Sequence, residues 1–310
     1  MAPPLIAVVG PTAAGKSALA LRLARRHGGE IVSCDSLQVY RGLDIGSAKA
    51  TREERASVPH HLLDVVEPDA AFSAADYARL ARAAIADIRR RGRLPIVAGG
   101  TGLYLRALLD GLFEGPSRDE ALRARLERIA ERGSARLHRL LGRVDPEAAA
   151  RTRPRDRVRL VRALEVFFLT GRPISAQQRR GGVGLAGPLL LIGLSPGRTA
   201  LREAVRARTR QMLERGLLVE VRGLVARYGE PLPRPLAAIG YRQAVAVLRG
   251  ELDEREAEPA IVTATMRFAK RQMTWFRHQP PRVANWFEAL ESAETFAAGW
   301  LATNAQPESP

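Results

Sequence analysis

The chain contains a single cysteine, Cys34, among its 310 residues. One cysteine excludes an internal disulfide framework and a zinc site built from cysteines. Long apolar runs are also absent, so the sequence predicts no membrane span. Residues 1–4 carry no charged side chain of the kind that opens a signal peptide, and the apolar run after them is short. We therefore expect a cytoplasmic protein with no membrane partner and no leader sequence.

Lysine is almost as scarce as cysteine. It occurs only as Lys16, Lys49 and Lys270, so arginine supplies nearly all of the 49 basic side chains, against 33 acidic ones. Using arginine in place of lysine leaves the charge unchanged, so it does not explain the formal net charge of +16. The excess favours a polyanionic partner such as a nucleic acid. Compositional drift is the alternative, and the charge alone does not exclude it.

The stretch from Gly10 to Ser17 has the spacing G-x-x-x-x-G-K-[ST] of a phosphate-binding loop. Its glycines let backbone N–H groups curl around phosphate oxygens, and the helix that follows points its positive end at the anion. Lys16 supplies a mobile charge, and the Ser17 hydroxyl can hold Mg²⁺. The predicted phosphate-binding residues are Gly10, Pro11, Thr12, Ala13, Ala14, Gly15, Lys16 and Ser17.

A chance glycine-rich turn is the alternative, but the apolar run 5–9 before the motif and the helical pattern after it favour a true phosphate site. The motif leaves open whether ATP, GTP or another diphosphate compound binds.

Alternating short apolar runs and helical patterns predict an α/β fold. Expected helices at 15–27 and 73–91 alternate with expected strands at 31–33 and 94–98, which indicates a parallel, doubly wound sheet like that of P-loop nucleoside triphosphatases. A buried strand is expected again at 189–194. Four further helices are expected, at 198–213, 216–227, 237–249 and 257–276. A disordered tail is expected at 305–310.

Residues 117–190 differ in texture from the rest of the chain. They form three or four helical patterns and hold 17 arginines against 8 acidic residues. We interpret them as an all-helical basic insertion with a flexible exit at 181–187. The predicted domains are a discontinuous catalytic core, 1–116 and 191–310, and the insertion at 117–190.

In open parallel sheets, ligand sites form beyond the carboxyl ends of the strands. Three predicted loops leave strands there: the phosphate loop, the stretch 35–40 and the stretch 99–104. Asp35 is a carboxylate aimed at the phosphates, and it acts either as a general base or as a water-mediated magnesium ligand or helix cap. Thr101 lies in a glycine-rich turn, where an anion contact and a helix cap are equally consistent with the spacing.

Arg208 interrupts the apolar stripe Leu201, Val205 and Met212 of one predicted helix. An arginine in such a stripe requires a partner, either a phosphate leaving group or a structural acid. His60 and His61 have no second ligand pair at metal spacing, which favours a loop against the core. The residues 270–272 either touch phosphate or are solvated. The aromatic residues expected in the core, rather than as stacking surfaces, are Trp275, Phe276, Trp286 and Phe287.

Taken together, the motifs resemble one family along most of the chain, the bacterial tRNA dimethylallyltransferases, also called tRNA isopentenyltransferases. The matching stretches, in chain order, are GPTAAGKS, DSLQVYRGLDIGSAKA, PHHLLDVVEP, FSAADY, VAGGTGLYLRALL, DPEAAAR, RALEVFFLTGRPIS, AAIGYRQ and FAKRQMTWFR.

The resemblance implies an activity and partners. The phosphate loop would hold the pyrophosphate of dimethylallyl diphosphate, with Mg²⁺ as cofactor. The exocyclic amine of the adenosine just 3′ of the tRNA anticodon would attack the allylic carbon, after the base is extruded into a channel of a monomeric enzyme. Such a base must leave its stack before it can be modified.

The resemblance also implies roles for single residues. Asp35 matches the family's general base, and Thr101 and Arg208 match groups at the pyrophosphate, so these three are the expected catalytic residues. Ser17 is the expected metal contact. The positions that match tRNA contacts are Asp35, Ser36, Leu37, Gln38, Thr101, Arg123, Arg159, Leu160, Val161, Arg162 and Ala163.

The chain departs from the family pattern at three places: GSAKA replaces GTAKP, Arg153-Pro154-Arg155-Asp156 replaces a His-Pro-Asn-Asp run, and Met266-Arg267 replaces two arginines. Two other functions remain open from the sequence. One is prenylation of free adenine nucleotides, which would not need an extended cationic insertion. The other is a small-molecule kinase, for which arginines 202–210 would imitate a catalytic lid.

Overall fold

The chain folds into two compact units, which we call the core unit and the helical unit. The computed structural model describes residues 4–113, 115–179 and 184–304. The core unit comprises Met1–Leu109 and Leu185–Pro310, and the helical unit comprises Asp110–Gly184. The insertion expected at 117–190 therefore begins and ends six or seven residues too late. Leu109 packs in the sheet core, and its carbonyl accepts a hydrogen bond of 3.0 Å from the Leu185 N–H. This bond joins the end of the first segment of the core unit to the start of its second segment.

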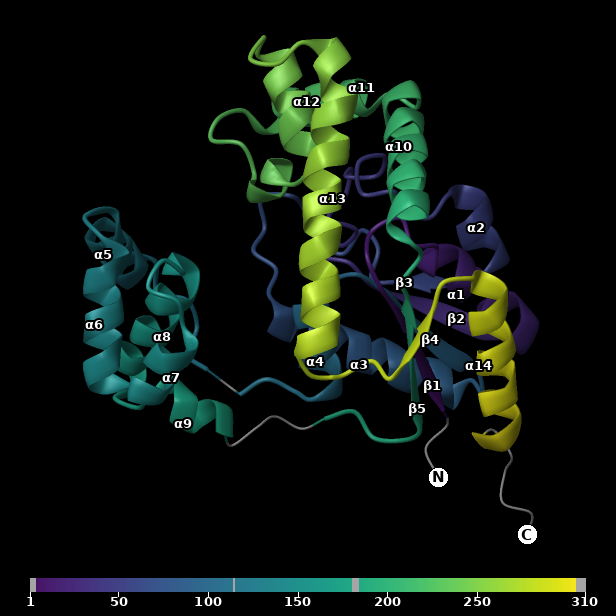
Figure 1. Ribbon diagram of the computed structural model, residues 1–310, viewed down its shortest axis with the longest axis horizontal. Helices are drawn as coiled ribbons and strands as arrows, with labels where there is room; N and C mark the ends of the chain where they lie inside the picture. Colours follow the sequence, from purple (N-terminus) through teal and green to yellow (C-terminus); the bar gives the residue numbers. More distant parts are fainter. Residues whose placement is uncertain (1–3, 114, 180–183, 305–310) are drawn as a thin grey trace. The chain divides into compact units, whose positions relative to one another are not determined.

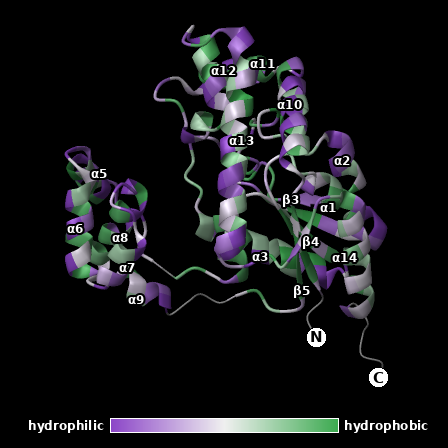
Figure 2. Ribbon diagram, in the orientation of Figure 1, coloured by the Kyte–Doolittle hydropathy of each residue, from purple (hydrophilic) through white to green (hydrophobic). Residues whose placement is uncertain are grey.

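The core unit is built on one six-stranded sheet in the order β3-β2-β4-β1-β5-β6, with every pairing parallel. This confirms the predicted α/β fold with a parallel sheet. The central strands are hydrophobic along their length (Figure 2), as expected for strands covered on both faces. The strands are β1 Leu5–Val9, β2 Gly29–Cys34, β3 His60–His61, β4 Leu94–Gly99, β5 Leu189–Leu194 and β6 Asn285–Phe287.

Some helices of the core unit cover this sheet, and others extend away from it (Figure 1). Those of its first half are α1 Lys16–His27, α2 Arg52–Ser57, α3 Ala74–Arg90 and α4 Gly102–Leu109. Those of its second half are α10 Arg198–Glu214, α11 Leu217–Tyr228, the 3₁₀ helix Arg234–Ala237, α12 Tyr241–Leu248, α13 Glu254–His278 and α14 Leu290–Asn304. None of the helices within the described residues is both long and apolar enough to span a membrane.

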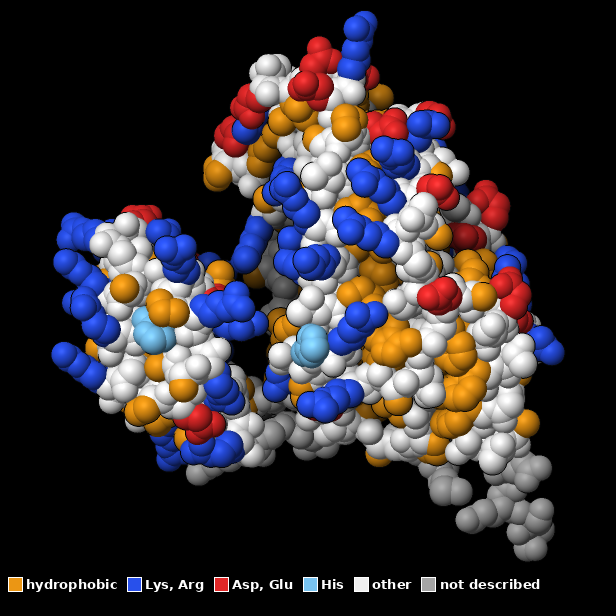
Figure 3. Space-filling view, in the orientation of Figure 1, with side chains coloured by type: hydrophobic (Ala, Val, Ile, Leu, Met, Phe, Trp, Pro, Cys, Tyr) orange, Lys and Arg blue, Asp and Glu red, His pale blue; other side chains and the backbone are white. Residues whose placement is uncertain are grey.

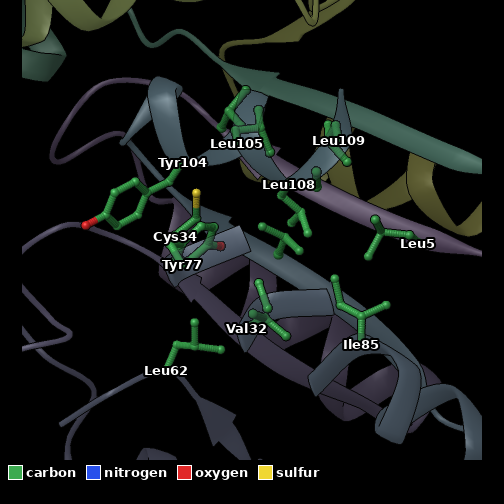
Figure 4. Close-up of a cluster of buried hydrophobic side chains, with 14 of the residues drawn as sticks. Leu5, Val32, Cys34, Leu62, Tyr77, Ile85, Tyr104, Leu105, Leu108 and Leu109 are labelled. Atoms are coloured by element: carbon green, nitrogen blue, oxygen red, sulfur yellow. The ribbon is translucent and has the colours of Figure 1, made fainter. Parts of the chain in front are cut away.

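Alternation along the strands sends side chains to two separate cores. Leu5, Ala7 and Val9 face α3 and α4, whereas Ile6 and Val8 face α1 and α14. Figure 4 shows part of the first core, where Cys34 of β2 lies beside the rings of two tyrosines. These rings, Tyr77 of α3 and Tyr104 of α4, are stacked with centroids 4.4 Å apart. The sheet is thus the middle layer of three.

A further cluster joins α10–α13 to the loop that follows β2. Leu43 of that loop packs with Met212, Leu217, Val221 and Tyr241. This cluster fixes the loop that carries Asp35 against the second half of the chain.

The helical unit has its own core. Its helices are α5 Glu120–Glu131, α6 Ser134–Val144, α7 Pro146–Arg151, α8 Arg157–Thr170 and α9 Ile174–Arg179. Leu126, Leu137, Leu141 and Leu160 are almost fully buried in it. Most of the unit's arginines lie on its surface, as the basic composition predicts.

Three details differ from the sequence expectations. His60 and His61 form an edge strand rather than a loop, because β2 offers a parallel partner to them. The short strand β6 and the helix α14 were not expected, since β6 has only three residues and α14 follows it directly. The tail 305–310 and residues 181–183 of the expected exit 181–187 lie outside the described residues.

Candidate active site

Three loops meet at the carboxyl edge of the sheet, after β1, β2 and β4. The sheet order places these strands next to one another. The loops after β2 and β4 lie so close that a Cβ on Gly99 would come within 2.0 Å of the Cys34 carbonyl oxygen. The Thr101 N–H also donates to that carbonyl, at 3.2 Å. Glycine at position 99 is therefore required by this close approach.

The phosphate loop has the backbone that its glycines allow. Gly15, at the start of α1, has a φ of 88°, and Gly10 has a φ of 143° with its Cα against the Leu194 carbonyl. The Lys16 amino group lies within the loop and donates to the Pro11 carbonyl at 2.7 Å. Ser17 is exposed in the first turn of α1. The loop thus presents backbone N–H groups and a helix amino end to an anion.

Gln272 of α13 joins two of the three loops. Its side-chain carbonyl accepts a hydrogen bond of 2.9 Å from the Thr12 N–H, and its amide donates to the Gly100 carbonyl at 3.0 Å. Gln272 is buried, whereas its neighbours Lys270 and Arg271 are exposed. The sequence analysis gave all three residues the same two alternatives. Gln272 differs because it lies on the buried face of α13, whereas the other two lie on its exposed face.

Thr101 serves a purpose that neither sequence interpretation included. Its hydroxyl accepts a hydrogen bond of 3.1 Å from the Ser36 N–H, so it anchors the loop after β2. Within that loop, the Asp35 carboxylate accepts a bond of 2.8 Å from the Leu37 N–H. One carboxylate oxygen of Asp35 is thereby fixed, and the other has no protein donor among the described residues.

Two cavities open beside these loops, and Arg208 of α10 lines both of them. The first, about 380 Å³, has Asp35, Ser36 and Thr101 in its wall. The second, about 400 Å³, has Lys16 and Ser17 in its wall. We call them the acceptor cavity and the phosphate cavity. Arg208 therefore stands between the expected general base and the phosphate loop.

The cations at this boundary have few anionic neighbours. The Arg208 Nε is buried without a hydrogen-bond partner, and no ion pair to Arg208 forms within the described ranges. Burial lowers the pKa of Arg208, while the charge of Asp35 opposes that shift. Burial and, to a smaller extent, the charge of Arg208 lower the pKa of Lys16 to about 8, and Asp35 again opposes the shift. These two cations lack counter-charges in the protein, and a bound diphosphate would supply them.

Among the residues expected to contact the target nucleotide, Ser36 and Leu37 line the acceptor cavity. Gln38 lines the phosphate cavity instead. Its amide donates to the carbonyls of Ser47 and Ala48, and its carbonyl oxygen accepts from the Ser33 hydroxyl. The side chain of Gln38 is thus engaged in shaping its own loop.

The expected tRNA-contacting residues of the helical unit differ in exposure. Leu160, Val161 and Ala163 are buried in the unit's core, so their side chains cannot contact RNA. Arg123 is 15% exposed and pairs with the fully buried Glu165 at 3.1 Å. Arg162 pairs with the same carboxylate at 2.8 Å and is 34% exposed. Arg159 alone of this group is well exposed, at 64%.

A bound magnesium ion would depend chiefly on the substrate for its ligands. No group of three or more His, Cys, Asp or Glu side chains in the described part of the chain could hold a metal ion. The exposed hydroxyl of Ser17 at the phosphate loop fits the usual arrangement, in which Mg²⁺ takes one or two protein oxygens, phosphate oxygens and water.

The fold is that of an α/β protein with a parallel sheet, and its three loops meet at the carboxyl edge of that sheet. A family model described as "IPP transferase" matches residues 38–279. A tRNA dimethylallyltransferase of Koribacter versatilis is 50% identical over 280 residues, which cover 90% of this chain and 91% of that protein. Another, of Anaeromyxobacter dehalogenans, is 54% identical over 276 residues and covers 89% and 92%.

Solved structures agree with these relatives. The tRNA isopentenylpyrophosphate transferase of Bacillus halodurans has a TM-score of 0.69 and 39% identity, covering 97% of this chain and 98% of its own. A eukaryotic dimethylallyltransferase described as acting on tRNA has a TM-score of 0.81 and 26% identity, covering 98% and 80%. The chain belongs to the IPP transferase family. The predicted family, fold class and enzyme class, a prenyltransferase, are confirmed.

Proposed function

We propose that this enzyme transfers the dimethylallyl group of dimethylallyl diphosphate to the exocyclic N6 amine of the adenosine 3′-adjacent to the anticodon in tRNA. The observation that carries the proposal is the position of Arg208, which lines both the cavity of Asp35 and the cavity of the phosphate loop. A donor with its diphosphate on the loop would present its allylic carbon past Arg208 toward Asp35. The names of the relatives support the same donor and acceptor.

The leaving group is stabilised at the phosphate cavity. The carbon–oxygen bond of the donor breaks, and pyrophosphate takes the bonding electrons. Lys16, Arg208 and the N–H groups at the start of α1 are preorganised cationic or dipolar groups facing this charge. Mg²⁺, held through Ser17, would neutralise further charge on the diphosphate.

The nucleophile is activated at the acceptor cavity. The adenine N6 amine forms the new bond to the allylic carbon and loses one proton. Asp35 takes that proton as general base, with the carboxylate oxygen that the Leu37 N–H does not occupy. Thr101 acts through Asp35, because its hydroxyl holds the Ser36 backbone in place.

The chain's own residues support the assignment of tRNA as acceptor. The net charge of +16 suits a polyanion, and the helical unit is rich in exposed arginines. We further propose that the enzyme acts as a monomer. We place this reaction in the cytoplasm, where its tRNA substrate is found.

Incubation with bulk tRNA and dimethylallyl diphosphate, without ATP, tests this function. Nucleoside mass analysis should then reveal adenosine carrying one dimethylallyl group. Parallel reactions contain free AMP in place of tRNA, or ATP in place of the prenyl donor. Prenylated AMP would favour the free-nucleotide enzyme, and ATP-dependent phosphate transfer would favour a kinase. Either result without modified tRNA would contradict the proposal.

A further inference from the structure

The acceptor cavity has a buried floor and an exposed rim, and the rim is partly aromatic. Floor residues such as Val205, Thr209 and Ile261 are at most 3% exposed. Phe268 of α13 lines the same cavity but is 36% exposed. Arg271, one helical turn further on, also lines the cavity and is exposed. Phe268 and Arg271 therefore lie where the cavity meets solvent.

These two side chains form a contact of their own. The guanidinium carbon of Arg271 lies 5.4 Å from the centroid of the Phe268 ring, within the range of a cation–π interaction. The other exposed phenylalanines in the described part of the chain, Phe168 and Phe296, line neither cavity. An exposed aromatic ring beside an arginine is suited to nucleobase stacking, because both groups present flat surfaces to a base.

The substrate would bring such a base to this position. Extrusion of the acceptor adenine into the cavity leaves its neighbours in the anticodon loop without a stacking partner. The neighbouring nucleotide remains at the rim, since only one base enters the floor. Lys and Arg side chains gather over α13 and α10 on the face shown in Figure 3, so this surface also attracts the phosphates on either side.

We propose that Phe268 and Arg271 form a stacking platform for one RNA base that directly flanks the acceptor adenosine. This inference rests on the proposed function, because it takes the acceptor cavity to be the site of an extruded base. Phe268 replaces the stacking that the flanking base loses, and Arg271 holds the ring and meets the adjoining phosphate. The platform contributes to RNA affinity and not to the chemical step.

A double-mutant cycle between protein and RNA tests the platform. The RNA is an anticodon stem-loop with the normal bases, or with an abasic site immediately 5′ or 3′ of the acceptor. The proteins are wild type, Phe268→Leu, Phe268→Trp and the control Phe296→Leu, which alters an exposed phenylalanine of α14. Dissociation constants are measured without prenyl donor, and rates are measured at saturating RNA.

We expect Phe268→Leu to weaken binding of the normal stem-loop about tenfold, a part of the usual stacking contribution of one base. Phe268→Trp should bind as wild type does, and Phe296→Leu should have no effect. For one of the two abasic RNAs, wild type and Phe268→Leu should bind equally, which shows coupling to that base. Saturating rates should stay within about twofold of wild type.

Additive losses with both abasic RNAs would overturn the platform, as would unchanged binding by Phe268→Leu. A large fall in the saturating rate would also overturn it, since it would place Phe268 in the chemical step. Failure of the proposed function is a separate result: wild type would then not prenylate the normal stem-loop, whatever the binding cycle shows.

Discussion

Arg208 shows how a single, partly buried charge can identify a binding site. An arginine whose Nε is buried without a partner is unfavourable in the free protein, because removing a charge from water is expensive unless a counter-charge replaces it. A diphosphate between Arg208 and the phosphate loop would supply that counter-charge. The sequence left open whether the partner of Arg208 is a structural acid or a phosphate. Arg208 forms no ion pair within the described ranges, which favours the phosphate.

We expect Arg208→Gln to slow single-turnover prenyl transfer by about 100-fold, the effect of removing one preorganised group from a developing anion. Thermal unfolding should show no loss of stability, since the variant removes a charge whose buried Nε has no hydrogen-bond partner. The control Arg206→Gln alters an exposed arginine on the same helix. Equal slowing by both variants would contradict a specific role for Arg208.

Lys16 gives a pH dependence to diphosphate binding. Burial lowers its pKa to about 8 from 10.5. A bound diphosphate favours the charged form, so affinity for inorganic pyrophosphate should fall as the pH rises through about 8. Binding titrations of wild type and Lys16→Met should differ in this: the variant binds more weakly and without that pH dependence. An unchanged profile would mean that Lys16 does not face the anion.

The same shift affects the stability of the free protein. Because folding lowers the pKa of Lys16, the unfolded chain binds more protons than the folded chain between about pH 8 and 10.5. The contribution of this group to the free energy of unfolding therefore rises with pH in that window and is lowest below pH 8.

The sequence predicts some residues of the site well and others poorly. Asp35 and Lys16 could be found because each follows a buried strand within a short motif, and parallel strands bring their carboxyl ends to one edge. Gln38 and Arg123 could not be placed, because their partners decide their exposure. Gln38 bonds to the backbone of its own loop, and Arg123 pairs with Glu165, whose burial depends on the packing of α8.

At the scale of elements, α13 holds two loops of the site in place. It contributes Gln272 to the two loops, Phe268 to the rim of the acceptor cavity, and Phe276 to the core beneath the sheet. Helix α11 has a comparable role at the loop after β2, where Glu220 accepts hydrogen bonds from the N–H groups of residues 44–46 and from the Tyr241 hydroxyl. The sequence predicts both helices, but a helix propensity carries no information on which loop a helix will hold.

Gln272→Met should remove the hydrogen bonds between α13 and the two loops while keeping the approximate volume of the side chain. The variant leaves the Thr12 N–H and the Gly100 carbonyl without partners, so we expect a loss of about 2–4 kcal/mol in the free energy of unfolding. Pyrophosphate binding should also weaken, because the Thr12 backbone is no longer fixed. Chemical denaturation and binding titrations measure the two effects, with Gln178→Met, at an exposed position, as control. A stable variant with normal binding would contradict the role of Gln272 in holding the two loops.

At the scale of the whole molecule, the arginines have two roles: some are exposed and available to RNA, and others form ion pairs that stabilise the fold. In the helical unit, Arg159 is exposed, whereas Arg123 is tied to a buried carboxylate. We therefore expect substitution of Arg123 to report on folding more than on RNA contact.

The pair Arg159→Gln and Arg123→Gln makes this division measurable. Arg159→Gln should leave thermal stability unchanged and reduce the slope of log affinity against log salt by about 0.7–0.9, the release expected for one phosphate contact. Arg123→Gln should destabilise the helical unit by about 2 kcal/mol, because a charge-assisted bond to a buried carboxylate is lost. An unchanged salt slope for Arg159→Gln would remove Arg159 from the RNA surface.

The central claim is that Asp35 accepts the proton of the attacking amine. Its most direct test is the single-turnover rate of Asp35→Asn in a preformed complex with stem-loop RNA, started by dimethylallyl diphosphate. Asparagine keeps the size of the side chain and one acceptor oxygen but removes the basicity. The rate should fall by roughly 10²–10⁴-fold, the usual effect of a positioned acid or base, while the RNA dissociation constant changes little. A rate equal to that of wild type would show that Asp35 shapes the loop after β2 and is not the base.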